Sequence, residues 1–145
     1  MHQFNQINRC KHAKHIALAL ALAAAHALAA AAPNPLSVHV LDLQSGLATE
    51  GIRVTLEQRS GEQWRALAGG VTNAQGRIAA LYPEGQPVAA GHYRIVFETG
   101  EHFARQGKPT FFPRIPVEFK MDAAAQHYHI PLLLSPFGYS TYRGN

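Results

Sequence analysis

The sequence has little cysteine, little net charge and none of the common nucleotide or metal motifs. Its 145 residues include one cysteine, Cys10, which excludes a disulfide framework within the chain and a cysteine-ligated zinc site. It contains no glycine-rich phosphate loop, no HExxH and no GxSxG, and no repeat with a period of about 20–50 residues. With 47% hydrophobic and 15% charged residues, the composition is that of a folded chain of one-domain length.

The amino-terminal segment has the pattern of an export signal. Residues 1–14 contain three basic residues and no acidic one, and the run 16–32 is apolar except for His26. A basic segment followed by a hydrophobic run rich in alanine and leucine is typical of a secretory signal peptide. The three basic residues are Arg9, Lys11 and Lys14. We therefore expect the chain to be exported to the periplasm.

A membrane anchor is the alternative interpretation of the same apolar run. Its length is at the lower edge of the roughly 17–25 residues that span a bilayer, and alanine, its commonest residue, is weakly hydrophobic. Small residues near its end allow cleavage at about residues 27–32. We therefore expect residues 1–30 to be a signal peptide, residues 31–145 to form one domain, and the mature protein to have no stable membrane anchor.

The charge of the domain differs from that of the whole chain. The formal net charge is +4 at pH 7, but without the three basic residues of the signal, ten basic residues remain against nine acidic ones. A nucleic-acid-binding surface needs an excess of positive charge, so we expect no nucleic-acid partner. A domain without cysteine also suits an oxidising compartment.

Short alternating segments, separated by turn residues, fill the domain. Apolar and polar residues alternate in 36–43, 52–57 and 93–98, which predicts strands with one buried face. Further strands are expected at 64–68, 77–82, 117–121, 127–134 and 140–143. About eight short strands without strand–helix alternation predict an all-β fold, most simply a two-sheet sandwich, whose exposed edges favour oligomerisation.

One short helix is expected at residues 99–106. Thr99 is placed to cap its N-terminus, Glu101 lies in the first turn where the helix dipole favours an anion, and Gly107 can end it. The prolines that follow predict that residues 111–116 form an edge strand or a connector.

Few polar residues have catalytic potential. His39 lies on the face of its strand opposite Val38 and Val40, so it is expected to point outward if the valines fill the core. Arg77 begins a strand after the turn at Gly76. Taken alone, each has a structural interpretation, as a satisfied strand histidine and as a solvated cation at a strand end.

Two histidines of the last long strand raise the question of a metal. His127 and His129 are two residues apart and project about 6.5–7 Å apart on one face of a strand, which can suit two zinc ligands. The same strand offers no aspartate, glutamate or cysteine to complete the site, so we expect no metal. The tail 142–145 is either a fraying terminus or a docked one.

Three stretches carry longer motifs: LSVHVLD at 36–42, GRI at 76–78 and HYHIPLLLSPFGYSTYRG at 127–144. They resemble the 5-hydroxyisourate hydrolases, the transthyretin-like enzymes of urate breakdown. Shorter matches extend the resemblance over residues 36–145, and the carboxy-terminal run is its most specific part.

The resemblance implies a fold, an assembly and an activity. The fold is the transthyretin sandwich of two four-stranded sheets with one short helix, and the assembly is a homotetramer, a dimer of dimers, with active sites where the outward sheet faces of two dimers meet. The activity is hydrolysis of the small molecule 5-hydroxyisourate to 2-oxo-4-hydroxy-4-carboxy-5-ureidoimidazoline, without cofactor or metal.

The resemblance also assigns site residues. Catalysis falls on His39, Arg77 and His129. Substrate binding falls on His39, Arg77, Tyr142, Arg143, Gly144 and Asn145. The family usually ends in serine where this chain has Asn145, which puts a proton-handling role for that last side chain in doubt but not a role of its backbone or terminal carboxylate.

The implied mechanism uses the two histidines as the base and the water-orienting group, with the arginine stabilising negative charge on the substrate. Which histidine takes the proton stays open. Two alternatives also stay open: a small-ligand binding module without catalysis, since transthyretin carries ligands in the same channel, and an exported structural β-domain.

Overall fold

The computed structural model describes residues 33–122 and 126–145, all within one compact unit, Pro33–Asn145. The predicted signal peptide, residues 1–30, lies outside the described residues. The described chain contains eight strands and one helix. The elements are β1 (Leu36–Asp42), β2 (Arg53–Ser60), β3 (Gln63–Val71), β4 (Arg77–Ile78), β5 (Gly91–Glu98), α2 (Thr99–Arg105), β6 (Ile115–Met121), β7 (Tyr128–Ser135) and β8 (Gly138–Thr141).

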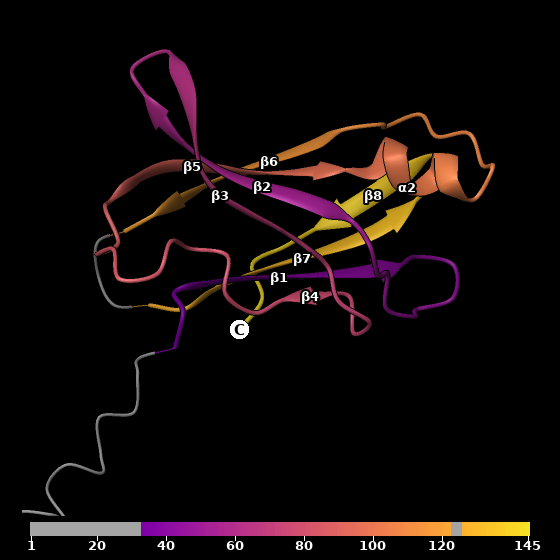
Figure 1. Cartoon of the computed structure of the whole chain (residues 1–145), viewed down its shortest axis with the longest axis horizontal. Coiled ribbons are helices and arrows are strands. Elements are labelled where there is room, and N and C mark those ends of the chain that lie inside the picture. Colours follow the sequence, from indigo (N-terminus) through magenta and orange to yellow (C-terminus); the bar gives the residue numbers. More distant parts are fainter. Residues whose placement is uncertain (1–32, 123–125) are drawn as a thin grey trace, which may run out of the picture. The chain divides into compact units, whose positions relative to one another are not determined.

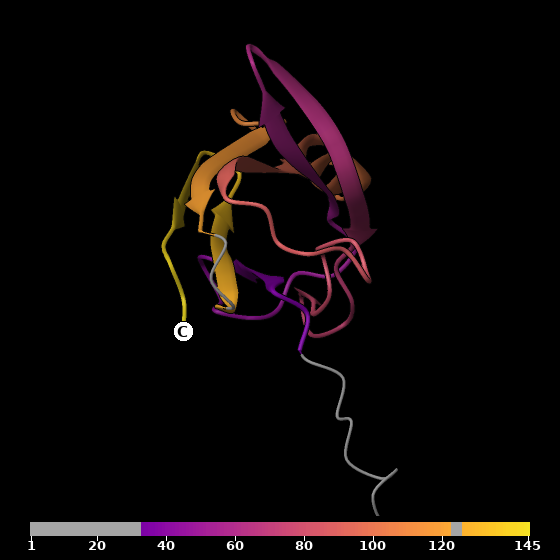
Figure 2. The ribbon, with the colours of Figure 1, turned by 90° about the vertical axis from the view of Figure 1, so that its left-hand side faces the viewer.

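The strands form two four-stranded sheets packed face to face, as expected. One sheet has the order β4-β1-β7-β8 and the other the order β3-β2-β5-β6. Figures 1 and 2 show the two layers, with α2 at one end of the sandwich and the tip of the β2–β3 hairpin projecting at the other. β1 and β7 pair in parallel, and the other strand pairs are antiparallel.

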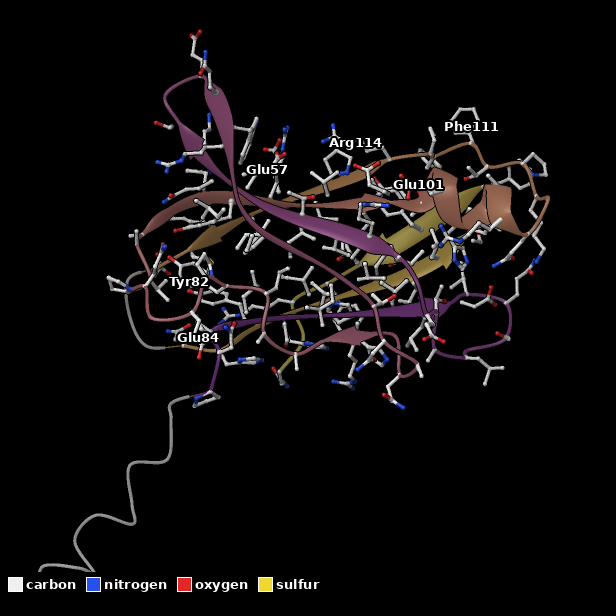
Figure 3. The ribbon with its side chains drawn as sticks, in the orientation of Figure 1. Glu57, Tyr82, Glu84, Glu101, Phe111 and Arg114 are labelled. Carbon is white, nitrogen blue, oxygen red and sulfur yellow. The ribbon has the colours of Figure 1, made fainter. Side chains whose placement is uncertain are left out.

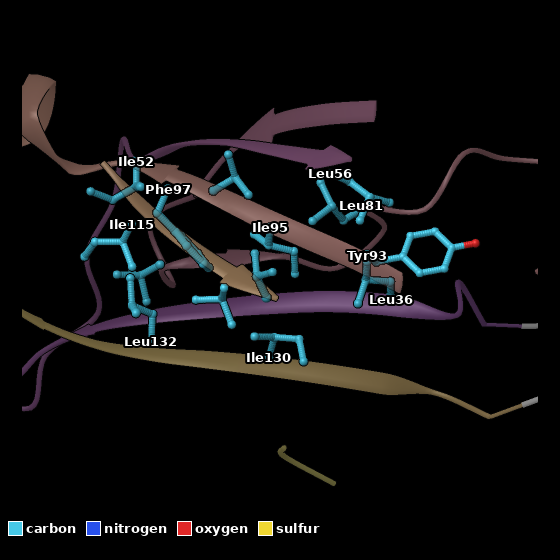
Figure 4. Close-up of a cluster of buried hydrophobic side chains, with 14 of the residues drawn as sticks. Leu36, Ile52, Leu56, Leu81, Tyr93, Ile95, Phe97, Ile115, Ile130 and Leu132 are labelled. Carbon is cyan, nitrogen blue, oxygen red and sulfur yellow. The ribbon is translucent and has the colours of Figure 1, made fainter. Parts of the chain in front are cut away.

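Alternation along the strands builds the core. Val38 and Val40 of β1 are fully buried, whereas His39 between them faces the other side of the sheet and is only half-buried. Side chains from both sheets fill the space between the layers (Figure 4). Burying one such aliphatic or aromatic side chain contributes about 1.5–3 kcal/mol to folding. The prediction that the valines take the core and His39 points outward is confirmed.

The strand predicted at 77–82 is wrong in length, because β4 ends at Ile78. The chain beyond it is held by other bonds: Leu81 N donates to the carbonyl of Leu36, and the side chain of Asn34 bonds both backbone groups of Tyr82. Leu81 and Tyr82 are buried, so the apolar character that suggested a strand reflects core packing without a ladder. The last predicted strand is also displaced, from 140–143 to β8.

The expected role of Thr99 as the helix cap is wrong. The helix begins at Thr99, its N-cap residue is Glu98, and no side chain caps it. The Thr99 hydroxyl instead donates to the carbonyl of Phe112, a contact across the fold. Glu101 does lie in the first turn, and the chain leaves the helix through Gly107 at φ +64°, where Gly107 N and Lys108 N donate to the last helical carbonyls.

On the outer face of the β3-β2-β5-β6 sheet, charged side chains form ion pairs with one another. The Glu57 carboxylate accepts from Arg94 and lies 3.9 Å from Arg114, which also donates to Glu98 at 3.2 Å. Figure 3 shows Glu57 and Arg114 on this face and Phe111 in the loop after α2. Among the described residues, no helix is long and apolar enough to cross a membrane.

Candidate active site

The predicted site residues gather on the outward face of the β4-β1-β7-β8 sheet. His39 of β1 pairs directly with Arg77 of β4, so the two side chains lie side by side on one face. The turn before Arg77 is fastened to β1, because Val40 N donates to the carbonyl of Gly76 at 2.8 Å. Gly76 has φ +69°, and a Cβ there would lie 2.4 Å from the Val40 carbonyl oxygen, so only glycine fits this turn.

His129 of β7 enters the same face from the other side of β1. It lies between the buried residues Tyr128 and Ile130, so its ring points away from the core. The ring centroids of His129 and His39 are 6.3 Å apart and the ring planes are inclined by 41°. The structure therefore brings the three predicted catalytic residues together from β1, β4 and β7.

Gly144, next to the last residue, contacts His129. Its N–H donates to the carbonyl of His129 at 2.9 Å, an isolated bridge beyond the end of β8. A Cβ at Gly144 would lie 2.5 Å from His129 Cδ2, so a larger residue would push the ring out of place. The tail is docked at this position, and Gly144 lies against the imidazole.

The other predicted binding residues of the tail are more distant from this contact. Tyr142 is 58% exposed, and Asn145 is exposed. Arg143 donates to the side chain of Gln126 at 2.9 Å, and its guanidinium lies 5.3 Å from the centre of the Tyr128 ring. Within this chain, the structure places Gly144 against the His129 imidazole but does not bring the side chains of Tyr142, Arg143 and Asn145 onto it.

Ser37 is a buried polar residue of this face that the sequence did not single out. Its Oγ lies 2.8 Å from His129 Nδ1 and 2.9 Å from His127 Nε2, and its residue is 8% exposed. His127 Nδ1 in turn donates to the carbonyl of Asn34 at 2.9 Å. The HxH spacing was the available signal, but from the sequence it raised only the question of a metal, which was answered in the negative. In the structure, a serine hydroxyl lies between the two rings.

The surroundings favour the neutral form of both central histidines. Burial is the main cause that lowers the pKa of His129 from its usual 6.5, followed by the charge of Arg77 and then the nearby imidazoles of His39 and His127. Burial and then Arg77 also lower the pKa of His39, against a smaller opposing effect of the Gln75 backbone. Neutral imidazoles can accept a proton near pH 7.

Arg77 contributes a positive charge to this face. Unlike Arg94 and Arg114 on the other sheet, it has no carboxylate partner among residues 33–122 and 126–145, and its side chain is exposed. In the same part of the chain, no three histidine, cysteine, aspartate or glutamate side chains gather as a metal site would need. Two neutral imidazoles beside an unpaired guanidinium can activate water and stabilise negative charge on a carbonyl oxygen.

Residues 36–144 match the model of the HIUase/Transthyretin family. The chain is 51% identical over 112 residues to the 5-hydroxyisourate hydrolase of Salmonella dublin, covering 77% of this chain and 82% of that protein.

Two solved structures share this fold. The 5-hydroxyisourate hydrolase of Klebsiella pneumoniae superimposes with a TM-score of 0.66 at 43% identity, over 77% of this chain and 94% of that one. Sea bream transthyretin in complex with thyroxine gives 0.70 at 35% identity, over 76% and 94%. The family match covers well over half of the sequence, and the chain therefore belongs to the HIUase/Transthyretin family.

Proposed function

We propose that this chain is a hydrolase that opens the ring of 5-hydroxyisourate in urate degradation. The observation that carries the proposal is the set of His39, Arg77 and His129 on one outward sheet face, with neutral imidazoles beside an arginine that has no acidic partner among the described residues. A relative named 5-hydroxyisourate hydrolase, 51% identical over 112 residues, supports it.

The proposed reaction is a hydrolysis of a cyclic amide. A histidine takes a proton from water while the water oxygen bonds to the ring carbonyl carbon. The guanidinium of Arg77 stabilises the negative charge that develops on the carbonyl oxygen. The carbon–nitrogen bond then breaks, and the departing nitrogen takes up a proton, which leaves a carboxyl group and a ureido group in the product.

A carrier of small ligands is the second candidate, because sea bream transthyretin shares the fold and was solved with thyroxine. The polar residues of the site argue against it for this chain. A carrier of an apolar aromatic ligand needs an apolar surface, whereas this face presents two histidines and a cation.

The test is to add purified protein, without residues 1–30, to freshly prepared 5-hydroxyisourate and to follow the loss of ultraviolet absorbance. We expect decay faster than the spontaneous rate and proportional to protein concentration. Binding of the substrate without faster decay would support the carrier instead. His39→Ala is the matched inactive control, since it removes one imidazole and leaves the core strand intact.

The assembly proposed for this chain is a homotetramer in which outward faces of the β4-β1-β7-β8 sheets meet. That face carries half-buried Leu41 and Leu133 beside the polar site, a mixture that a second copy can cover. Covering the face would remove water from around His39 and His129, which strengthens electrostatic interactions there.

Export to the periplasm is also proposed, on the basic and then apolar pattern of residues 1–32. Mature protein isolated from its cell should begin at about residues 28–33, as measured by amino-terminal sequencing of the periplasmic fraction. Recovery of the chain from the cytoplasm with Met1 or its neighbours still attached would contradict export.

A further inference from the structure

A chain of hydrogen bonds runs from a backbone carbonyl to the ring of His129. The Asn34 carbonyl lies 2.9 Å from His127 Nδ1, and His127 Nε2 lies 2.9 Å from Ser37 Oγ. Ser37 Oγ lies 2.8 Å from His129 Nδ1. Asn34, whose carbonyl begins this series of hydrogen bonds, is held in place. Its side chain accepts from Leu36 N and forms hydrogen bonds with both backbone groups of Tyr82.

The donor and acceptor chemistry of these groups sets the direction of every bond. A carbonyl oxygen can only accept, so His127 Nδ1 carries a proton and donates it. In a neutral imidazole the other nitrogen is then an acceptor, so His127 Nε2 accepts the single hydroxyl proton of Ser37. The Ser37 oxygen must then accept from His129, and the ring proton of neutral His129 is on Nδ1.

We propose that Ser37 and His127 hold His129 as the Nδ1–H tautomer, so that Nε2 of His129 is the atom that takes the proton from the attacking water. The proposal rests on the proposed hydrolase function. It answers which histidine is the base by assigning that role to His129. Ser37 and His127 are positioning residues, since they act only through the His129 ring.

Three further observations agree with this assignment. His129 Nε2 has no hydrogen-bond partner in the described part of the chain, so its lone pair is available there. Gly144 packs against Cδ2, next to Nε2, and so restrains the ring in the plane that the Ser37 bond sets. Burial and Arg77 lower the pKa of His129, which keeps the ring neutral and able to accept a proton.

The first test reads the tautomer directly. Protein labelled with ¹⁵N at the histidine rings is measured by NMR at about pH 8, above the ordinary histidine pKa of about 6.5. His129→Gln identifies the signals of His129. We expect a protonated Nδ1 and an unprotonated Nε2 for His129 in the wild type. Ser37→Thr, which keeps the hydroxyl, should preserve this pattern.

Two variants should release the tautomer. Ser37→Ala removes the acceptor for Nδ1–H. His127→Ala removes the acceptor for the Ser37 proton, so that Ser37 can donate to His129 Nδ1 and shift the ring proton to Nε2. In both, the ¹⁵N signals should move towards the Nε2–H form. His92→Ala, at an exposed position of β5, is the matched control and should leave the His129 signals unchanged.

The second test measures activity on 5-hydroxyisourate. We expect kcat to fall at least about tenfold in Ser37→Ala and His127→Ala with little change in KM, within the roughly 10⁴-fold loss known for a catalytic histidine in the wrong tautomer. Ser37→Thr, which keeps the hydroxyl, should retain most of the wild-type kcat. A merely structural role would alter the melting temperature without moving the His129 signals.

The two proposals fail in different ways. Active wild-type protein with the His129 proton on Nε2 overturns the tautomer assignment and leaves the hydrolase function standing. Wild-type protein that has the Nδ1–H signal and does not accelerate the decay of 5-hydroxyisourate supports the hydrogen-bond chain and overturns the hydrolase function. Loss of the Nδ1–H pattern in Ser37→Ala without any loss of rate also overturns the proposal that His129 Nε2 is the base.

Discussion

His39 and His129 each occupy a strand position whose neighbours on both sides are buried in the core, yet their own rings face outward. Removing such a ring leaves the packing between the sheets untouched. Function and stability can therefore be separated at single residues in this chain, which makes substitution at the site informative.

The first prediction concerns the three residues that meet on this face. His39→Ala, Arg77→Ala and His129→Ala should each lower kcat/KM by about 10²–10⁴-fold, the usual cost of losing a general base or a charge-stabilising donor. Each should unfold close to the wild-type temperature, since truncations in the core, which cost about 2–5 kcal/mol, are not involved. Initial rates corrected for spontaneous decay and melting curves measure both.

The matched control for this set is His92→Ala, which removes an exposed histidine from the other sheet. It should keep both the wild-type rate and the wild-type melting temperature. A His39 or His129 variant with a near-normal rate would remove that residue from the mechanism.

The second prediction concerns pH. Because burial and Arg77 lower the pKa values of His39 and His129, both stay neutral to lower pH than a free histidine, and the acid limb of kcat/KM should lie below pH 6.5. Arg77→Ala removes a positive charge that disfavours the imidazolium form. The pKa values should rise and the acid limb should move to higher pH.

Arg77→Lys keeps the charge and is the control for the pH profile. Its acid limb should stay close to that of the wild type even if its rate falls through loss of the planar guanidinium. An Arg77→Ala profile that coincides with the wild type would show that Arg77 does not act on the histidines.

The sequence predicted His39, Arg77 and His129 through the family resemblance, and the alternation around His39 predicted that its side chain points outward. Ser37 was not predicted. Its role depends on two histidines about 90 positions away, and serine in a strand has no local pattern that marks such a partner. Because these partners are far apart in the sequence, only the folded structure shows that Ser37 contacts them.

Among the described elements, β4 is the shortest, and the turn at Gly76 fastens its start to β1. Gly76→Ala should destabilise the protein by about 1–3 kcal/mol, because the position combines φ +69° with a Cβ that would lie 2.4 Å from the Val40 carbonyl oxygen. The turn should move away from β1 and carry Arg77 with it, so kcat/KM should fall as well. Denaturant unfolding and initial rates measure the two effects.

Gly61→Ala separates strain from packing in this experiment. Gly61 also has a positive φ, +61°, but a Cβ there meets nothing within 4 Å, and it lies at the tip of the β2–β3 hairpin. It should lose less stability than Gly76→Ala and no activity. Equal losses in the two variants would mean that the contact with Val40 is unimportant.

The sequence predicted correctly those helices and strands that local residue patterns determine. It failed where contacts with distant residues determine the structure. The alternation of β1, β2 and β5 predicted those strands. Thr99 looked like a cap by its residue type, but its hydroxyl bonds the Phe112 carbonyl, which lies 13 residues further on. The apolar residues after Ile78 pack in the core without pairing, which periodicity alone does not distinguish from a strand.

For the whole molecule, the prediction concerns assembly. Ser140 pairs with Leu133 on the outward face of the β4-β1-β7-β8 sheet and is exposed in the single chain. If two dimers meet there, Ser140→Glu buries an unpaired charge and should dissociate the tetramer and reduce activity together. Light scattering and rates per chain at equal concentration measure both.

Ser60→Glu is the matched control for assembly, since Ser60 is an exposed serine at the end of β2 in the other sheet. It should remain a fully active tetramer. A Ser140→Glu dimer with the full rate per chain would place the complete site within one dimer.

The two-sheet class followed from strand number and alternation, whereas the strand order did not. The parallel pairing of β1 with β7 places Ser37 opposite His129, and nothing between these strands in the sequence announces that pairing. The site exists because this one pairing lays the first described strand beside the seventh.

The alternation of inward and outward residues on β1 and β7 has a consequence for descent. In each strand the inward residues pack in the core, and the outward residues are available to contact a ligand. Selection can therefore change the outward residues while the inward residues keep the sandwich folded. A common ancestor could thus give rise both to hydrolases such as that of Salmonella dublin and to a transthyretin crystallised with thyroxine, at 35–51% identity to this chain and without a change of architecture.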